Sequence, residues 1–145
     1  LTELCIELAR KIPDDGEGAT HLITIDVRGT DDRLNAKQIA RTIADSALVK
    51  TAVTGGDPNW GRIVSAAGYA GVPFDPAEVD LSVNGHLLYK QGSPVPFDAA
   101  TVSGSIKGQR ETHVELTVGQ GPGDCRFWTS DLTVEYVRFN SEYTT

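Results

Sequence analysis

The most distinctive residues in this chain lie between Lys50 and Gly71. This stretch contains the string Gly-Gly-Asp-Pro-Asn-Trp-Gly-Arg at 55–62, followed by small and apolar residues. Glycine reaches positive φ freely and proline fixes φ at about −65°, so the string predicts an unusual backbone path. Its Asp-Pro-Asn can cap a helix from about Trp60 to Gly68, with backbone N–H groups facing out of the loop. Such a loop can receive a carboxylate or phosphate, or it can be a rigid connector packed on Trp60.

A second group of residues, Asp-Gly-Glu-Gly-Ala-Thr at 15–20, contains polar side chains that could bind a ligand. The glycines on either side of Glu17 would let the backbone approach a ligand closely. A solvated turn whose carboxylate binds nothing has the same composition, so the string alone leaves both interpretations open.

The usual catalytic and metal-binding patterns are absent from the sequence. His21, His86 and His113 fall in or beside predicted strands and show neither HxH nor HExxH spacing. A zinc site needs closer clustering of His, Cys and carboxylates, so we expect no metal site. No GxSxG elbow or P-loop occurs, so the sequence reveals no nucleophile, and we expect no cofactor.

Helical periodicity appears in two segments. Apolar residues from Leu1 to Ile12 recur at helical spacing, and a second helix face runs from Ile39 to Ala47. Asn35 and Gln38, three residues apart, predict a capping box at the start of the second helix.

Strand patterns dominate the rest of the chain. Residues 21–27 alternate and are rich in β-branched side chains, and residues 79–83 and 86–89 flank Asn84-Gly85, the favoured pair for a two-residue hairpin turn. Strands are also predicted at 112–118 and along 126–139, with 119–124 as a hairpin loop between them. These patterns predict an α+β fold in which helices pack on a mixed or antiparallel sheet.

Composition limits the classes of partner. The formal charge of −7 argues against nucleic acid, because phosphate-binding domains need clustered Lys and Arg. No apolar segment is long enough to cross a bilayer, so we expect no membrane association.

Cys5 and Cys125 are too few for a disulfide scaffold and are expected to be buried free thiols in a reducing compartment. Because the chain lacks methionine and begins with an uncapped helix at Leu1, we expect it to be a piece of a longer protein.

Four segments together resemble the ornithine acetyltransferase family, also called the bifunctional glutamate N-acetyltransferase of arginine biosynthesis. They are DGEGAT at 15–20, SALVKTAVTGGDPNWGRI at 46–63, AAGYAG at 66–71 and TVEYVRFNSEYTT at 133–145. The resemblance follows the whole chain but covers only the C-terminal portion of the family's β chain. It implies one domain over residues 1–145, incomplete without upstream sequence, with the N-terminal-nucleophile-like fold of that family.

The resemblance implies an N-acetyltransferase that moves acetyl from N-acetylornithine to glutamate through an acetyl-threonine. In this family the precursor cleaves itself and exposes the nucleophilic threonine, whose α-amine can act as its base. That threonine lies upstream, so no catalytic residue is assigned to this chain. The implied substrate-binding residues are Glu17, facing an ammonium of ornithine, and Asn140 and Thr145 in a tail that tucks inward, where they would orient the substrate.

Two further expectations concern the signature motif and the tail. Lys50 and residues 57–62 are expected to shape the pocket wall, with direct ligand contact as the alternative, and Arg62 is able to pair with Asp57. Phe139 and Thr144 depart from the aliphatic residue and the arginine common in the family, which bears on substrate preference.

The implied partners are N-acetylornithine, glutamate, acetyl-CoA in bifunctional members, and upstream α and β segments in a heterotetramer. The implied location is the cytoplasm, or the mitochondrion in a eukaryote. The alternatives are a non-catalytic chain of this fold that binds a small anion or serves assembly, and an interaction module without a ligand.

Overall fold

The computed structural model describes residues 1–143. Helices and strands are interspersed along these residues, and all of the strands belong to one sheet. The helices are α1 (Thr2–Asp14), α2 (Arg33–Asp45), α3 (Ala47–Gly55), α4 (Trp60–Gly68), the short 3₁₀ helix η1 (Pro76–Glu78), α5 (Ala99–Lys107) and α6 (Val134–Glu142). The strands are β1 (Leu22–Gly29), β2 (Asp80–Val83), β3 (His86–Lys90), β4 (Ser93–Pro94), β5 (Glu111–Thr117) and β6 (Gly121–Ser130).

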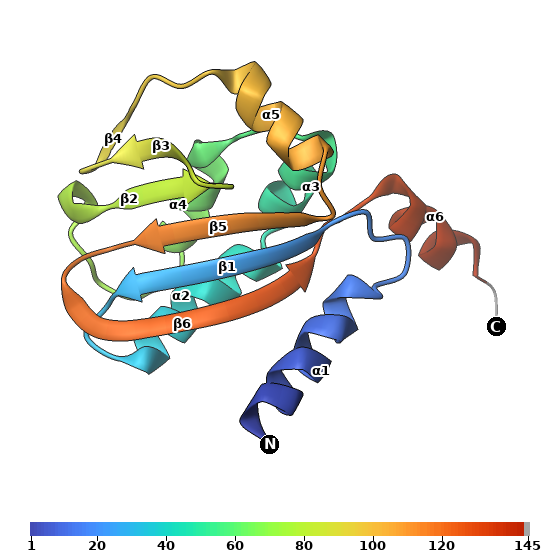
Figure 1. The fold of residues 1–145 in the computed structure, drawn as a ribbon, viewed down its shortest axis with the longest axis horizontal. Helices are drawn as coiled ribbons and strands as arrows, with labels where there is room; N and C mark the ends of the chain where they lie inside the picture. The colour runs from blue at the N-terminus through green and yellow to red at the C-terminus, as the bar shows by residue number, and fades with distance from the viewer. Residues whose placement is uncertain (144–145) are drawn as a thin grey trace.

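The six strands lie in the order β4-β3-β2-β5-β1-β6. Only the β1–β5 pair is parallel, and the other pairs are antiparallel, so the sheet is mixed. Figure 1 shows α2 and α4 behind the sheet, while α1 and α6 extend from the end where β1 begins and β6 ends. The α+β fold predicted from the sequence is confirmed.

The hydrophobic core fills the side of the sheet that α2 covers. Ile23 and Ile25 of β1 are fully buried, as are Ile39 and Ile43 of α2. Burying each such side chain stabilises the fold by about 1.5–3 kcal/mol. β1 therefore anchors the sheet, with β5 on one side of it and β6 on the other.

The opposite face of β1 is polar and contains a buried carboxylate. Asp26, only 5% exposed, accepts hydrogen bonds from Arg126 Nε and Nη2, both at 2.7 Å, and its Oδ2 lies 2.8 Å from His113 Nε2. The bonds from Arg126 lower the pKa of Asp26; burial opposes them, and His113 lowers the pKa further. The carboxylate therefore stays ionised although it is buried.

The terminal helices contrast with this core. Neither α1 nor α6 has a single buried residue, although α1 presents large apolar side chains such as Leu4, Leu8 and Ile12. Between residues 1 and 143, no helix combines the length and apolarity that a membrane span requires.

Several local predictions are confirmed. Asn84 and Gly85 both have positive φ, 48° and 78°, and connect β2 to β3 as the expected hairpin. The helix from Trp60 to Gly68 begins as expected, with the Asn59 side chain accepting from the Arg62 N–H at 3.2 Å. At α2 the predicted capping box is wrong: Asp32 is the cap, and its carboxylate accepts from the Asn35 N–H.

The predictions for the second half of the chain are partly wrong. The strand expected along 126–139 ends at Ser130, and helix α6 follows, capped by Thr133. The β-branched and aromatic residues of α6 are typical of strands, which is why the sequence predicted a strand there. Residues 119–124 are not a hairpin loop, since β1 lies between β5 and β6 and pairs with both. Helix α5, capped by Asp98, was not predicted. Cys125 is buried as expected, but Cys5 is exposed.

We predict that Asp26→Asn lowers the free energy of unfolding by about 2 kcal/mol at pH 7, because its charge-assisted bonds to Arg126 are lost. Asp26 has a folded-state pKa below its ordinary 3.8, so its contribution is complete above that value and disappears as pH falls through the folded pKa. Urea denaturation across pH measures both effects.

The matched control for this prediction is Asp45→Asn, since Asp45 is 70% exposed and forms only an i,i+4 pair with Arg41. That change should cost less than about 0.5 kcal/mol. Equal denaturation midpoints for the two variants would contradict the prediction.

Candidate functional site

Two of the residues predicted to bind substrate lie against each other. Glu17 belongs to the loop between α1 and β1, and Asn140 lies near the end of α6. The Asn140 side-chain amide donates to Glu17 Oε2 at 3.2 Å across 123 residues of sequence, and it also donates to the Tyr136 carbonyl at 2.9 Å. Both side chains are exposed, so a carboxylate and an amide face solvent together.

The prediction that the C-terminal tail tucks inward can be compared with the structure only up to residue 143. Thr145, and also Thr144, lie outside the described residues, so the role expected for Thr145 stays a prediction. The described part of the tail is helix α6, which has no buried residue in this chain. Within residues 1–143 the tail contacts the loop that carries Glu17, through Asn140 and Thr133, but α6 itself is not buried.

The loop that carries Glu17 fits closely against the first turn of α6. Gly18 has φ 68°, and a Cβ added there would lie 2.8 Å from the Tyr136 backbone nitrogen. The Thr133 hydroxyl donates to the Gly18 carbonyl at 2.7 Å and also accepts from the Tyr136 N–H, so one side chain caps α6 and fixes the loop. Glycine is required here because a side chain would push the loop away from the helix.

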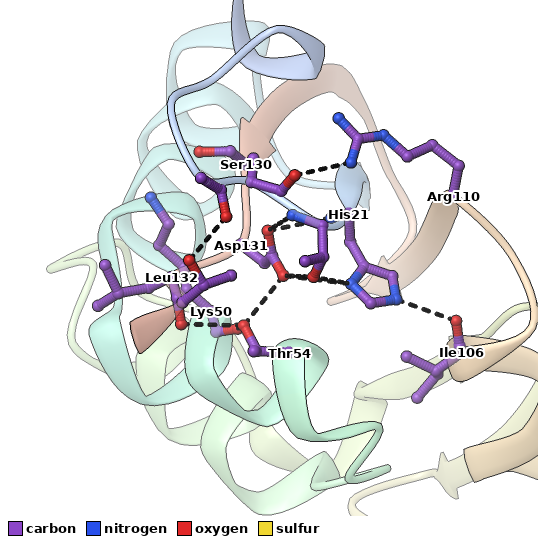
Figure 2. A network of polar contacts seen from close by, with 12 residues as sticks. His21, Lys50, Thr54, Ile106, Arg110, Ser130, Asp131 and Leu132 are labelled. Atoms are coloured by element: carbon purple, nitrogen blue, oxygen red, sulfur yellow. Dashed lines mark hydrogen bonds and ion pairs between the residues drawn. The ribbon is translucent and has the colours of Figure 1, made fainter. Parts of the chain in front are cut away.

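A buried carboxylate, Asp131, joins the same loop to the connection between β6 and α6. Its Oδ1 accepts from the backbone N–H groups of Thr20 at 2.9 Å and His21 at 3.0 Å. Its Oδ2 accepts from the hydroxyls of Thr20 at 2.5 Å and Thr54 at 3.0 Å and lies 3.1 Å from His21 Nδ1. Figure 2 shows Asp131 between His21 and Thr54, with the other ring nitrogen of His21 directed at the Ile106 carbonyl.

These donors determine the ionisation of Asp131. Burial acts to raise its pKa, but the hydrogen bonds from Thr20 and His21 outweigh burial and hold the pKa below its ordinary value. Nothing in the sequence pointed to this residue, because it falls inside the stretch that we predicted as one long strand.

The signature loop at 55–62 is a connector rather than an open anion site. Gly56 adopts the left-handed conformation and its N–H donates to the Val53 carbonyl, while the Asp57 N–H donates to the Ala52 carbonyl at 2.8 Å. The N–H groups of Asn59, Trp60 and Arg62 also have intramolecular acceptors. The expectation that these groups face outward is therefore wrong.

The side chains of the loop also have structural partners. Arg62 Nη1 donates to the Leu48 carbonyl at 2.9 Å instead of pairing with Asp57, whose carboxylate accepts from the Asn59 amide at 3.0 Å. The Trp60 ring packs against Tyr89 with centroids 5.1 Å apart. The loop thus ties α3 to α4 and to the sheet.

One group of described side chains has metal-binding composition, namely Asp26, His113 and Glu115. Arg126 donates to both oxygens of Asp26, and the guanidinium of Arg28 lies 3.6 Å from Asp26 Oδ2 and 3.7 Å from Glu115 Oε1. Two cations already neutralise these carboxylates, so the geometry favours an ion-pair network over a metal site.

Comparisons of this chain with family models, curated sequences and solved structures all point to the same family. The model of the ArgJ family matches residues 1–145. A relative from Rhodopirellula baltica, named "Arginine biosynthesis bifunctional protein ArgJ", is 51% identical over 99% of this chain and 35% of its own length. The crystal structure of "Arginine biosynthesis bifunctional protein argJ" from Bacillus halodurans has a TM-score of 0.94 and 36% identity, covering 97% of this chain and 66% of that chain.

The chain therefore spans about 35% of the length of the curated relatives it matches. A relative from Citrullus lanatus, 47% identical over 95% of this chain and 31% of its own length, is named chloroplastic. The mitochondrial location expected for eukaryotic members has no support among these relatives.

We predict that Gly18→Ala destabilises the protein by about 1–3 kcal/mol, because alanine must adopt positive φ while its Cβ meets the backbone of Tyr136. Gly104→Ala in α5 is the control, since its added Cβ would meet no described atom within 4 Å beyond its own helix backbone, and helix propensity favours alanine by about 1 kcal/mol. Urea denaturation should show opposite signs for the two variants, and hydrogen exchange at the Tyr136 amide should accelerate only in Gly18→Ala. A Gly18→Ala protein as stable as the unmodified one would refute the close fit.

Proposed function

This chain belongs to the ArgJ family, and from that premise we propose that it forms part of an N-acetyltransferase. The whole protein would move acetyl from N-acetylornithine to glutamate, and this chain would supply part of the substrate site. The observation that carries the assignment is the contact between Glu17 and Asn140. A surface carboxylate beside an amide, held there by distant parts of the chain, suits a substrate that carries an ammonium group.

Glu17 has the role of binding that ammonium. Its Oε2 accepts from Asn140, whereas within residues 1–143 its Oε1 accepts no protein hydrogen bond and so remains available to a ligand. A charge-assisted bond of this kind contributes about 1.5–3 kcal/mol. Asn140 orients the carboxylate, and Thr145 completes the substrate contacts, as the family resemblance implies.

The reaction itself takes place on a threonine outside this chain. After self-cleavage of the precursor, the threonine oxygen attacks the acetyl carbonyl of N-acetylornithine, and ornithine leaves with its amine protonated. The amine of glutamate then takes the acetyl group and restores the hydroxyl. Bifunctional members would accept acetyl from acetyl-CoA as well, and no other cofactor is needed for either transfer.

We also propose that the upstream segments of the precursor pack on α1, within a heterotetramer located in the cytoplasm. Helix α1 supports this, because Leu4, Leu8 and Ile12 lie on an amphipathic helix and are 56%, 53% and 77% exposed. The curated relatives are about three times as long as this chain, so they contain additional sequence that can cover such a face.

The acetyl-enzyme itself tests the proposed function. The full-length protein is incubated with N-acetylornithine, and denaturing mass spectra are recorded over time. We predict one acetyl adduct on the chain that begins with the nucleophilic threonine, and peptide mapping should place the adduct on that threonine and outside residues 1–145. Glu17→Gln should lower the rate of adduct formation at subsaturating substrate about 10- to 100-fold, because the charged contact is lost.

The control is Glu7→Gln on α1, where the carboxylate is 64% exposed and, among residues 1–143, pairs only with Lys11 at 3.3 Å. Its rate should equal that of the unmodified protein. Absence of an adduct would reject acetyl transfer, while an adduct that forms at the normal rate in Glu17→Gln would remove Glu17 from the substrate site.

We predict further that Leu8→Glu weakens association with the upstream segments at least tenfold, because a charge would be buried in an apolar contact. Leu34→Glu is the control, since Leu34 is 76% exposed on α2, in a part of the fold remote from α1. Co-purification of separately tagged segments measures the effect. Equal recovery with both variants would exclude α1 from the interface.

A further inference from the structure

We propose that Asp131 is a positioning residue that holds Glu17 and Asn140 in register with each other. This inference rests on the proposed function for its effect on substrate, but its geometric basis is independent of that function. Asp131 lies between the last residue of β6 and Thr133, the cap of α6. Its side chain is fully buried, so it cannot itself contact a substrate.

The contacts of Asp131 reach both sides of the candidate site. On one side they hold Thr20 by its N–H and its hydroxyl, and Thr20 is three residues after Glu17. On the other side Asp131 leads directly into α6, whose second turn carries Asn140. The Asp131 N–H also donates to the His21 carbonyl at 3.1 Å, so the two chain segments bind each other in both directions.

Helix α3 is also joined to the Asp131 carboxylate. Thr54, in the last turn of α3, directs its hydroxyl at Asp131 Oδ2, at the Leu132 carbonyl 2.9 Å away and at the Lys50 carbonyl 3.2 Å away. The signature loop begins at the residue after Thr54. Figure 2 shows Thr54, Leu132 and Lys50 on one side of the carboxylate and His21 on the other. The motif at 55–62 therefore supports the candidate site indirectly, because it follows Thr54, which bonds to Asp131.

No other described side chain performs this task. Arg110 holds the loop from the side of α1, donating to the Ala19 carbonyl at 2.9 Å and to Asp14 Oδ1 at 3.1 Å, but it forms no hydrogen bond with the described residues of α6. Thr133 joins Gly18 to α6 by a single hydroxyl. Among residues 1–143, Asp131 alone joins the Glu17 loop, the entry to α6 and helix α3.

The first test is a double-mutant cycle on the full-length enzyme. Asp131→Asn keeps the shape but replaces an acceptor oxygen with an amide that cannot accept from Thr20 and Thr54. We expect the KM for N-acetylornithine to rise about tenfold with kcat unchanged, because the ammonium contact acts in both the ground and transition states. In a Glu17→Gln background the same change should raise KM less than about twofold, since coupled residues are not additive.

The second test does not depend on activity. Glu17→Cys and Asn140→Cys are combined in a protein whose exposed Cys5 is replaced by serine, and the rate of disulfide formation between positions 17 and 140 is measured. We expect Asp131→Asn to slow it at least fivefold. Asp26→Asn is the control, because it also neutralises a buried carboxylate of the same sheet but touches neither the loop nor α6.

The outcomes separate the two proposals. Additive effects in the cycle, or equal slowing by Asp131→Asn and Asp26→Asn, would show that Asp131 acts through global stability and would overturn this inference. If Glu17→Gln leaves activity intact while Asp131→Asn still slows the disulfide, the substrate role fails and the positioning role stands. Thr54→Val should slow the disulfide to a smaller extent, because only one of the donors to Asp131 is then lost.

Discussion

The antiparallel register between β1 and β6 determines where the residues of the candidate site lie. Leu22 at the start of β1 pairs with Ser130 at the end of β6. The residues just before β1 and just after β6 therefore meet at one end of the sheet, where Thr20 and His21 surround Asp131. A shift of one residue would turn the buried side chains of β1 to the wrong face, so the core enforces this register.

The two buried carboxylates on this framework are satisfied in different ways. Asp26 lies in the middle of β1 and is neutralised by the guanidinium of Arg126 on the polar face of the sheet. Asp131 lies at the end of β6 and accepts hydrogen bonds from hydroxyl and backbone N–H groups of Thr20, His21 and Thr54. A buried carboxylate is costly unless all of its donors are present. The arrangement around Asp131 therefore exists only when three segments of the chain are assembled together.

The most recognisable motif of the sequence turns out to be structural. Its backbone N–H groups bond to carbonyls of the loop and of α3, Arg62 bonds to the Leu48 carbonyl, and Trp60 packs on Tyr89. These contacts fix α3 and α4 on the sheet and hold Thr54 toward Asp131. A motif that identifies the family therefore need not touch the ligand, because the shape of a site depends on its support as well as on its contacts.

The sequence by itself determined the features that depend on neighbouring residues. These are the alternation of β1, the Asn84-Gly85 turn, the Asn59 cap and the motifs shared with the ArgJ family, from which Glu17 and Asn140 were named. Only the tertiary structure decided features that depend on distant partners. The segment 131–142 has strand-like composition, yet it forms a short irregular connection and then helix α6. The reason is that the buried side chains of Asp131 and Thr133 bond to Thr20 and Gly18. The contact between Glu17 and Asn140 joins positions 123 residues apart, and no local pattern encodes such a distance.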